Sequence, residues 1–209
     1  MNIFRHIRYI AFAAVVLTAL GAGARDAAQW LVSAPANVLS GVPRNTRLDA
    51  LDYYNSGVSR DVAADDHISV RITRLTPQAI TMRRGSESTI QIAALPAGRD
   101  TLLAVIYTID KPTAISSISF YDRDWQPAAK QPFTMPGFTD WIASDADADA
   151  DVLQATLGFI PATAEFSATA DSLVITNTGA ENARLNGVEG DLKSSIVFTV
   201  KKAKFSPAK

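Results

Sequence analysis

The chain has 209 residues, and its 20 Lys and Arg against 21 Asp and Glu leave a formal net charge of −1. A balance this mild disfavours nucleic-acid binding, which needs a basic face, and gives little attraction for anionic lipid headgroups. The sequence contains no cysteine, which excludes thiolate metal ligands, thiol nucleophiles and attachment as a bacterial lipoprotein. With only His6 and His67 present, a multi-histidine zinc site or a Ser-His-Asp relay is also disfavoured, and no cofactor is expected.

The first 24 residues have the three-part layout of a secretory signal peptide. Arg5 and Arg8 form a basic region, residues 10–20 are apolar, and small residues follow up to Ala24, after which cleavage is expected. An apolar stretch of 11 residues is shorter than the roughly 20 that a membrane-spanning helix needs, so we expect no permanent span after cleavage. This predicts an exported protein, periplasmic or associated with the outer membrane, in which residues 25–209 form one domain of net charge −3.

Helical signals open this domain. Residues 27–32 are a cluster of mostly apolar side chains, and Pro35 suits the first turn of a second short helix. A third helix is predicted over residues 47–57, capped by Asn45 or Thr46.

The third helix is expected to be amphipathic. Apolar residues at spacings of three and four should share one face: Leu48, Leu51, Tyr54 and, nearby, Val58. On this interpretation Arg47 and Asp49 point away from that face.

From residue 67 the apolar period changes to two, which is typical of strands. Five strands with short turns are predicted, over residues 67–75, 78–83, 88–95, 101–110 and 115–122. The fourth is apolar almost throughout and should be a central strand buried on both faces. Such spacing favours an antiparallel meander over βαβ units.

Regular structure is interrupted next and then resumes. Residues 122–150 contain prolines that prevent long elements, and a short helix is predicted over residues 152–160. Three more strands are predicted over residues 163–169, 172–178 and 194–205.

Together these elements predict a mainly β domain of the α+β class. Short N-terminal helices should pack on one antiparallel sheet of eight or more strands, and a sheet of that size curls to cover its apolar face. The curved outline, an unclosed barrel, is similar to that of periplasmic lipoprotein carriers, in which helices cover a hydrophobic cavity. An analogy of architecture does not determine function.

An acidic run is the first candidate site. Its aspartates alternate with alanines, as in the first half of a calcium loop: Asp145, Asp147, Asp149 and Asp151. An EF-hand loop then needs a glycine at its sixth position and a glutamate at its twelfth, where this chain has Ala150 and Thr156. A solvated loop that caps the following helix is favoured over a weak Ca²⁺ site.

Two further clusters are candidates for ligand or partner binding. Asp122 and Asp124 follow a strand, where aspartates make turn hydrogen bonds, and Trp125 is either an exposed anchor or a cover for the sheet edge. Asp49 and Asp52 lie three residues apart, as an acid–base pair can, although a solvated face or a salt bridge with an arginine is the favoured interpretation. The candidate binding residues are Arg47, Asp49, Asp52, Tyr53, Asp122, Asp124 and Trp125.

Several segments carry a resemblance. They are RLDALDYYNSG at residues 47–57, LT at 75–76, STIQI at 88–92 and ISFYD at 118–122 followed by Trp125. In order and spacing they resemble an uncharacterised family of small exported Bacteroidales proteins, known as a domain of unknown function. The resemblance covers most of residues 26–126 and implies export and a Bacteroidales origin. It brings no activity, catalytic residue or cofactor.

Three functions remain open. The first is a non-catalytic binding or carrier module of the cell envelope, with a lipid or other hydrophobic ligand in an apolar cavity between sheet and helices. The second is a structural or interaction protein that binds an envelope partner through exposed aromatics, such as those around Phe133, Phe138 and Trp141. The third is an enzyme that uses carboxylates alone, either Asp49 with Asp52 or Asp122 with Asp124.

Overall fold

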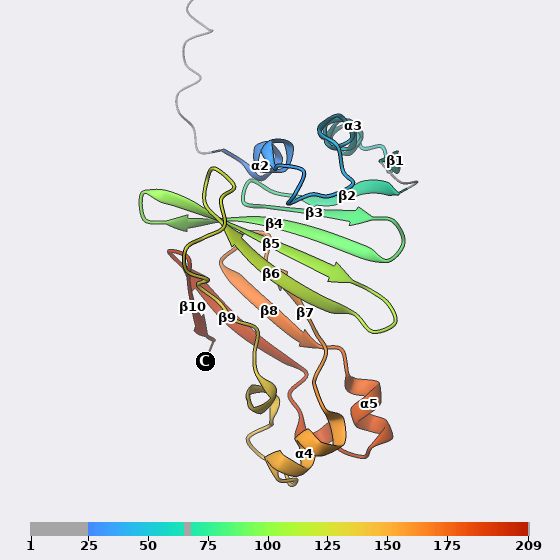
Figure 1. The fold of residues 1–209 in the computed structure, drawn as a ribbon, viewed down its shortest axis with the longest axis vertical. Helices are drawn as coiled ribbons and strands as arrows, with labels where there is room; N and C mark the ends of the chain where they lie inside the picture. Colours follow the sequence, from blue (N-terminus) through green and yellow to red (C-terminus); the bar gives the residue numbers. More distant parts are fainter. Residues whose placement is uncertain (1–24, 65–67, 209) are drawn as a thin grey trace, which may run out of the picture.

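A computed structural model describes residues 25–64 and 68–208 of the chain. The predicted signal peptide and its cleavage point, as well as His67, lie outside these residues. Within the described residues ten strands form two antiparallel sheets, and helices accompany each sheet (Figure 1). The predicted mainly β class with N-terminal helices is confirmed, but the strands divide into two sheets instead of the single sheet expected.

The first sheet is a six-stranded meander in which each strand pairs with the next along the chain. Its strands are β1 (Val62–Ala63), β2 (Ser69–Leu75), β3 (Ala79–Arg84), β4 (Ser88–Ala97), β5 (Asp100–Ile109) and β6 (Ile115–Tyr121). The longest pair joins β4 to β5, with an unbroken register from Ser88 opposite Ile109 to Ala97 opposite Asp100. The strands predicted from the two-residue period are all present.

The second sheet has the strand order β10-β9-β8-β7. Its strands are β7 (Ala162–Phe166), β8 (Ser172–Asn177), β9 (Ser195–Lys201) and β10 (Lys204–Pro207). The single strand predicted over residues 194–205 is wrong, because the chain turns back at Lys202 and Ala203, whose φ angles are 50° and 54°. Glycine, asparagine or aspartate normally marks a turn with two positive φ angles, and neither position has one.

Helices lie at two places in the molecule (Figure 1). Near the N-terminus, α2 (Ala27–Ser33) and α3 (Arg44–Asn55) cover one face of the first sheet. At the far end of the second sheet lie α4 (Ala150–Leu157), α5 (Ala180–Leu185) and the short 3₁₀ turns η2 (Phe138–Trp141) and η3 (Glu189–Asp191). The helix predicted after Pro35 is no more than turns.

The buried face of α3 is not the one that its apolar spacing predicted. Leu51 is buried as expected, but Leu48 and Tyr54 are exposed. The buried face consists of Thr46, Arg47, Ala50 and Leu51. The expectation that Arg47 points away from the core is therefore wrong, and its hydrogen bonds, described below, give the reason.

Alternation along β4 and β5 produces two cores, one on each side of the first sheet. Successive side chains of a strand point to opposite faces. Ile92 and Val105 pack against the two N-terminal helices in the first core. Ala104 and Ile106 pack in the second core, which the second sheet closes with side chains such as Phe166. The result is a three-layer arrangement of helices, sheet and sheet.

The two-core arrangement predicts that alanine substitution affects stability very differently at two phenylalanines. Phe120 is buried in the second core and stacks edge-on against Phe205, with ring centroids 5.8 Å apart, whereas Phe159 is 66% exposed. Phe120→Ala should lower the free energy of unfolding by about 3–5 kcal/mol, and Phe159→Ala by no more than about 0.5 kcal/mol. Urea denaturation followed by tryptophan fluorescence measures both, and equal losses would contradict the layering.

Candidate functional site

Arg47 has a structural role at the end of a helix. Its side chain is buried, only 4% exposed, and Nη1 donates hydrogen bonds to the carbonyl oxygens of Leu31 at 2.8 Å and Ala34 at 2.6 Å. These carbonyls lie at the C-terminal end of α2, where a cation also interacts favourably with the helix dipole. Burial, and to a smaller extent the charge of Arg44, lowers the pKa of the Arg47 guanidinium.

The other predicted residues of α3 are not brought together with Arg47. Asp49 and Asp52 are exposed on the solvent side of the helix, whereas Arg47 points inward. Tyr53 is half-buried against the first core, and the Arg60 guanidinium lies 5.6 Å from the centre of its ring. The α3 cluster thus combines a structural arginine with two solvated carboxylates.

The turn around Trp125 holds the sheet to the N-terminal helices. The Asp122 carboxylate accepts hydrogen bonds from the backbone N–H groups of Asp124 and Gln126, both at 2.9 Å, while Asp124 itself is exposed. Trp125 is buried, and its Nε1 donates to the Ser33 hydroxyl of α2 at 3.2 Å. It covers the helix–sheet boundary instead of projecting into solvent.

The four aspartates of the acidic run are all exposed. Asp149 caps α4 by accepting a hydrogen bond from the Asp151 N–H at 2.9 Å. The carboxylate of Asp191, far along the chain, accepts a hydrogen bond from the Asp147 N–H at 2.7 Å. In residues 25–64 and 68–208, no three or more histidine, cysteine or carboxylate side chains converge on one point as metal ligands do.

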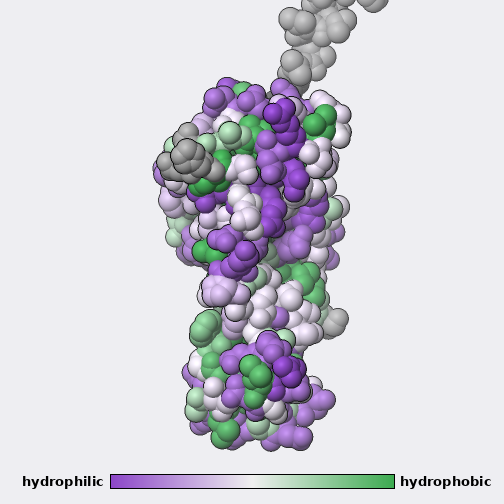
Figure 2. All heavy atoms as spheres, turned by 90° about the vertical axis from the view of Figure 1, so that its right-hand side faces the viewer, coloured by the Kyte–Doolittle hydropathy of each residue, from purple (hydrophilic) through white to green (hydrophobic). Residues whose placement is uncertain are grey.

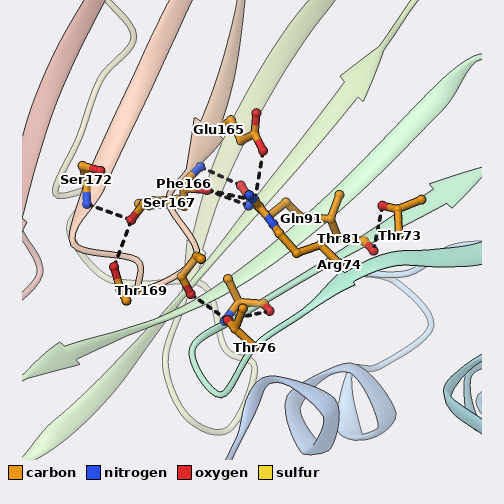
Figure 3. Close-up of polar contacts among 12 residues, drawn as sticks. Thr73, Arg74, Thr76, Thr81, Gln91, Glu165, Phe166, Ser167, Thr169 and Ser172 are labelled. Atoms are coloured by element: carbon orange, nitrogen blue, oxygen red, sulfur yellow. Dashed lines mark hydrogen bonds and ion pairs between the residues drawn. The ribbon is translucent and has the colours of Figure 1, made fainter. Parts of the chain in front are cut away.

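A polar network between the two sheets was not anticipated from the sequence (Figure 3). Gln91 of β4 is buried, and its side-chain amide bonds both backbone groups of Phe166 in β7: Oε1 accepts from N–H at 2.8 Å, and Nε2 donates to the carbonyl at 3.1 Å. Arg74 Nη2 donates to the same carbonyl at 2.9 Å and lies 3.0 Å from Glu165 Oε1. These side chains complete the hydrogen bonds of an edge strand.

Other side chains of the first sheet extend this network. The Ser116 hydroxyl accepts a hydrogen bond from the Ala164 N–H of β7 at 2.9 Å. A bulge in β2 shifts the register between Ile72 and Arg74 and places Arg74 opposite Thr81, on the face toward the second sheet. The one available sequence signal was Gln91, a polar residue between Ile90 and Ile92 in a mostly apolar strand.

The space beside the network is a small polar pocket of about 200 Å³. Threonines from four strands line it, Thr81, Thr89, Thr108 and Thr163, together with Gln91 and Glu165. Its volume is below the roughly 300–1,000 Å³ typical of ligand pockets. Both polar groups of the Gln91 side chain already bond Phe166, so we assign this region to the contact between the two sheets.

A larger and more apolar pocket of about 420 Å³ lies at the far end of the second sheet. The turn before β6, the link from α4 to β7 and the start of α5 line it: Pro112, Thr113, Ile115, Leu157, Phe159, Pro161, Thr178, Gly179, Glu181 and Asn182. We call it the Phe159 pocket. Phe159 and Ile115 are exposed, and on the lobe that carries α4 and α5 hydrophobic residues stand among hydrophilic ones (Figure 2).

The predicted location of a ligand cavity, between the helices and the first sheet, is occupied by the first core. Two grooves do occur on the helical side of the described residues. One of about 400 Å³ is lined by residues of α2, its cap and α3. The other, of about 390 Å³, is lined by the end of α3, the turn that follows it and β2, and its lining is nearly as polar as it is apolar. Strand, turn and helix residues line both this second groove and the Phe159 pocket, and of the two the Phe159 pocket has the more apolar lining. None of the candidate binding residues predicted from the sequence lines it.

The fold and the sites define a helix–sheet–sheet protein of the mainly β class. The chain belongs to the family described as Protein of unknown function (DUF3256), whose profile matches residues 19–205. This confirms the predicted membership of an uncharacterised family. In the described residues, no helix has the length and apolar character required to cross a bilayer.

A solved structure shares the fold. It is a domain of an uncharacterized protein from Porphyromonas gingivalis W83, with a TM-score of 0.71 and 18% sequence identity, and the alignment covers 88% of this chain and 98% of that one. At this identity the likeness shows the fold alone. No curated protein matches the chain.

The role assigned to Arg47 predicts a large loss of stability in Arg47→Met. Methionine keeps much of the apolar stem but leaves two carbonyls without their donor, so the free energy of unfolding should fall by about 2–4 kcal/mol. Arg44→Met, on an exposed position of the same helix, is the control and should change it by less than about 0.5 kcal/mol. Chemical denaturation measures the free energy of unfolding of both variants, and a wild-type value for Arg47→Met would refute the capping role.

The polar network predicts that Gln91→Leu lowers the free energy of unfolding by about 1–3 kcal/mol, because the buried Phe166 N–H loses its acceptor. Amide exchange at Phe166 should accelerate. Thr89→Val, a nearly isosteric change two residues earlier on the same strand face, provides the control and should leave that exchange rate unchanged. Unaltered Phe166 exchange in Gln91→Leu would show that the amide does not support β7.

Proposed function

We propose that this protein is an exported, non-catalytic binding module of the bacterial cell envelope that takes an apolar group of its ligand into the Phe159 pocket. The observation that carries the proposal is a concave apolar site in which a phenylalanine is 66% exposed. Export rests on the signal-like layout of the first 24 residues. Exposed apolar surface in a concavity is typical of binding sites.

The size of the pocket and its exposed surface fit this role. A volume of about 420 Å³ lies within the roughly 300–1,000 Å³ typical of ligand pockets. Fully burying a phenylalanine side chain contributes about 1.5–3 kcal/mol, and two thirds of the Phe159 surface is still available for that gain. Ile115, which also lines the pocket and is 44% exposed, offers further apolar surface for burial.

The positions of the predicted carboxylates argue for binding without catalysis. Asp49 and Asp52 lie on the solvent side of α3, and neither lines the Phe159 pocket. Asp122 is engaged by two backbone N–H groups, and Asp124 is exposed. No pair of these groups lies at the bottom of the Phe159 pocket, where an acid–base mechanism would need them.

Most of the aromatic residues proposed for the alternative interaction surface are not exposed. Trp125 and Trp141 are buried, and Phe133 packs edge-on against Phe198 at 4.9 Å. Phe159 is the most exposed of the large aromatics in the described residues. The binding-module and the interaction-surface interpretations therefore both point to the Phe159 pocket.

Binding of the neutral fluorescent probe N-phenyl-1-naphthylamine tests this function. The wild-type protein should bind the probe, and Phe159→Ala should weaken binding about 5- to 30-fold, because the contact it removes is worth roughly 1–2 kcal/mol. Leu185→Ala is the control, since Leu185 is 70% exposed in the same lobe but does not line the pocket. An absence of probe binding, or an equal loss in both variants, would overturn the proposal.

A further inference from the structure

Charge is distributed unevenly between the two ends of the molecule. We define the acidic lobe as residues 138–161 and 178–194, which include α4, α5, η2 and η3. Its acidic residues number eight: Asp140, Asp145, Asp147, Asp149, Asp151, Glu181, Glu189 and Asp191. Its two basic residues are Arg184 and Lys193. The rest of residues 25–209 carries 16 basic and 13 acidic residues, so the lobe has the opposite sign.

The two basic residues of the lobe are already engaged locally. Arg184 donates to both carboxylate oxygens of Glu181, at 2.9 Å and 2.6 Å, which lowers the pKa of Glu181. Lys193 Nζ donates to the backbone carbonyl of Asp140 at 2.8 Å. Neither basic residue therefore pairs with the carboxylates of the acidic run or of η3. Their negative charge stays available to a positively charged ligand.

Most of the Phe159 pocket belongs to this acidic lobe, and the remaining lining, Pro112, Thr113 and Ile115, comes from the first sheet. Leu157, at the end of α4, lines the pocket, and Asp149 caps the beginning of the same helix. Eight helical residues extend over about 12 Å. Because an extended chain spans roughly 3.3 Å per residue, a segment of about four residues seated on Leu157 and Phe159 can place a basic side chain beside Asp149 and Asp151.

We propose that the Phe159 pocket binds a protein segment that has one or two large apolar residues flanked by lysines or arginines. The inference rests on the proposed function and names its partner class. The pocket has room for one or two such side chains, and the acidic groups spread over α4, η3 and the preceding loop, a wider area than a small molecule covers. Anionic lipid is repelled by the same charge.

Two synthetic peptides of equal apolar content test the inference. Calorimetry should show that KKGFLGKK binds at least tenfold more tightly than EEGFLGEE in 50 mM salt, and that this preference shrinks as salt rises to 500 mM. Phe159→Ala should weaken the lysine peptide about 5- to 30-fold, as for the neutral probe. Equal affinity for the two peptides would overturn the inference while leaving the proposed function intact if the neutral probe still binds.

Charge variants separate the lobe from the rest of the surface. The double variant Asp147→Asn with Asp151→Asn removes two exposed carboxylates and should weaken the lysine peptide about threefold or more without changing neutral-probe binding. The matched control is Asp49→Asn with Asp52→Asn on α3, which changes the net charge equally and should leave the affinity within twofold. Equal effects of the two pairs would overturn the local charge argument.

Sedimentation without peptide tests whether a second copy of the chain occupies the pocket. The positively charged remainder of a second copy also complements the acidic lobe. A monomer at all concentrations supports the inference, whereas self-association that Phe159→Ala abolishes would assign the pocket to a second copy and overturn it.

Discussion

The pairing of β4 with β5, buried on both faces, is the constraint on which the rest of the structure depends. The two strands share a continuous register, and their alternate side chains supply apolar groups to both cores. A sheet that is apolar on both faces has to be covered on both. The N-terminal helices cover one face, and the four-stranded sheet covers the other (Figure 1). In this protein the cover on that face is a separate four-stranded sheet, which closes the second core.

The second sheet is attached through an edge strand as well as through apolar packing. β7 would otherwise leave the backbone groups of Ala164 and Phe166 unpaired, and Gln91, Ser116 and Arg74 satisfy them. Because a buried backbone N–H or carbonyl group without a partner is costly, these hydrogen bonds favour one position of the second sheet against the first. That position carries α4 and α5 beyond the first sheet and leaves the Phe159 pocket open at the far end.

Local pattern predicted most of the elements but few of the decisive side chains. Two-residue periods found β2–β6, and apolar clustering found α2, because those signals depend on neighbours in the chain. The hairpin at Lys202 has no turn residue to mark it, and no helix was predicted between residues 178 and 194, where α5 lies. Arg47 is buried because carbonyls of another helix accept its hydrogen bonds. Phe159, which follows α4, is exposed because no other described part of the fold covers it. Both depend on tertiary structure, which the local sequence pattern does not report.

The proposed binding surface is the acidic lobe around the Phe159 pocket, and not the helical side of the molecule. Hydrogen–deuterium exchange of the protein with and without KKGFLGKK tests it most directly, because it reports the location of contact independently of affinity. Exchange should slow only in the three segments that contribute the pocket lining, residues 112–115, 157–161 and 178–182. Slower exchange on α2 and α3, or beside the network at Gln91, would contradict it.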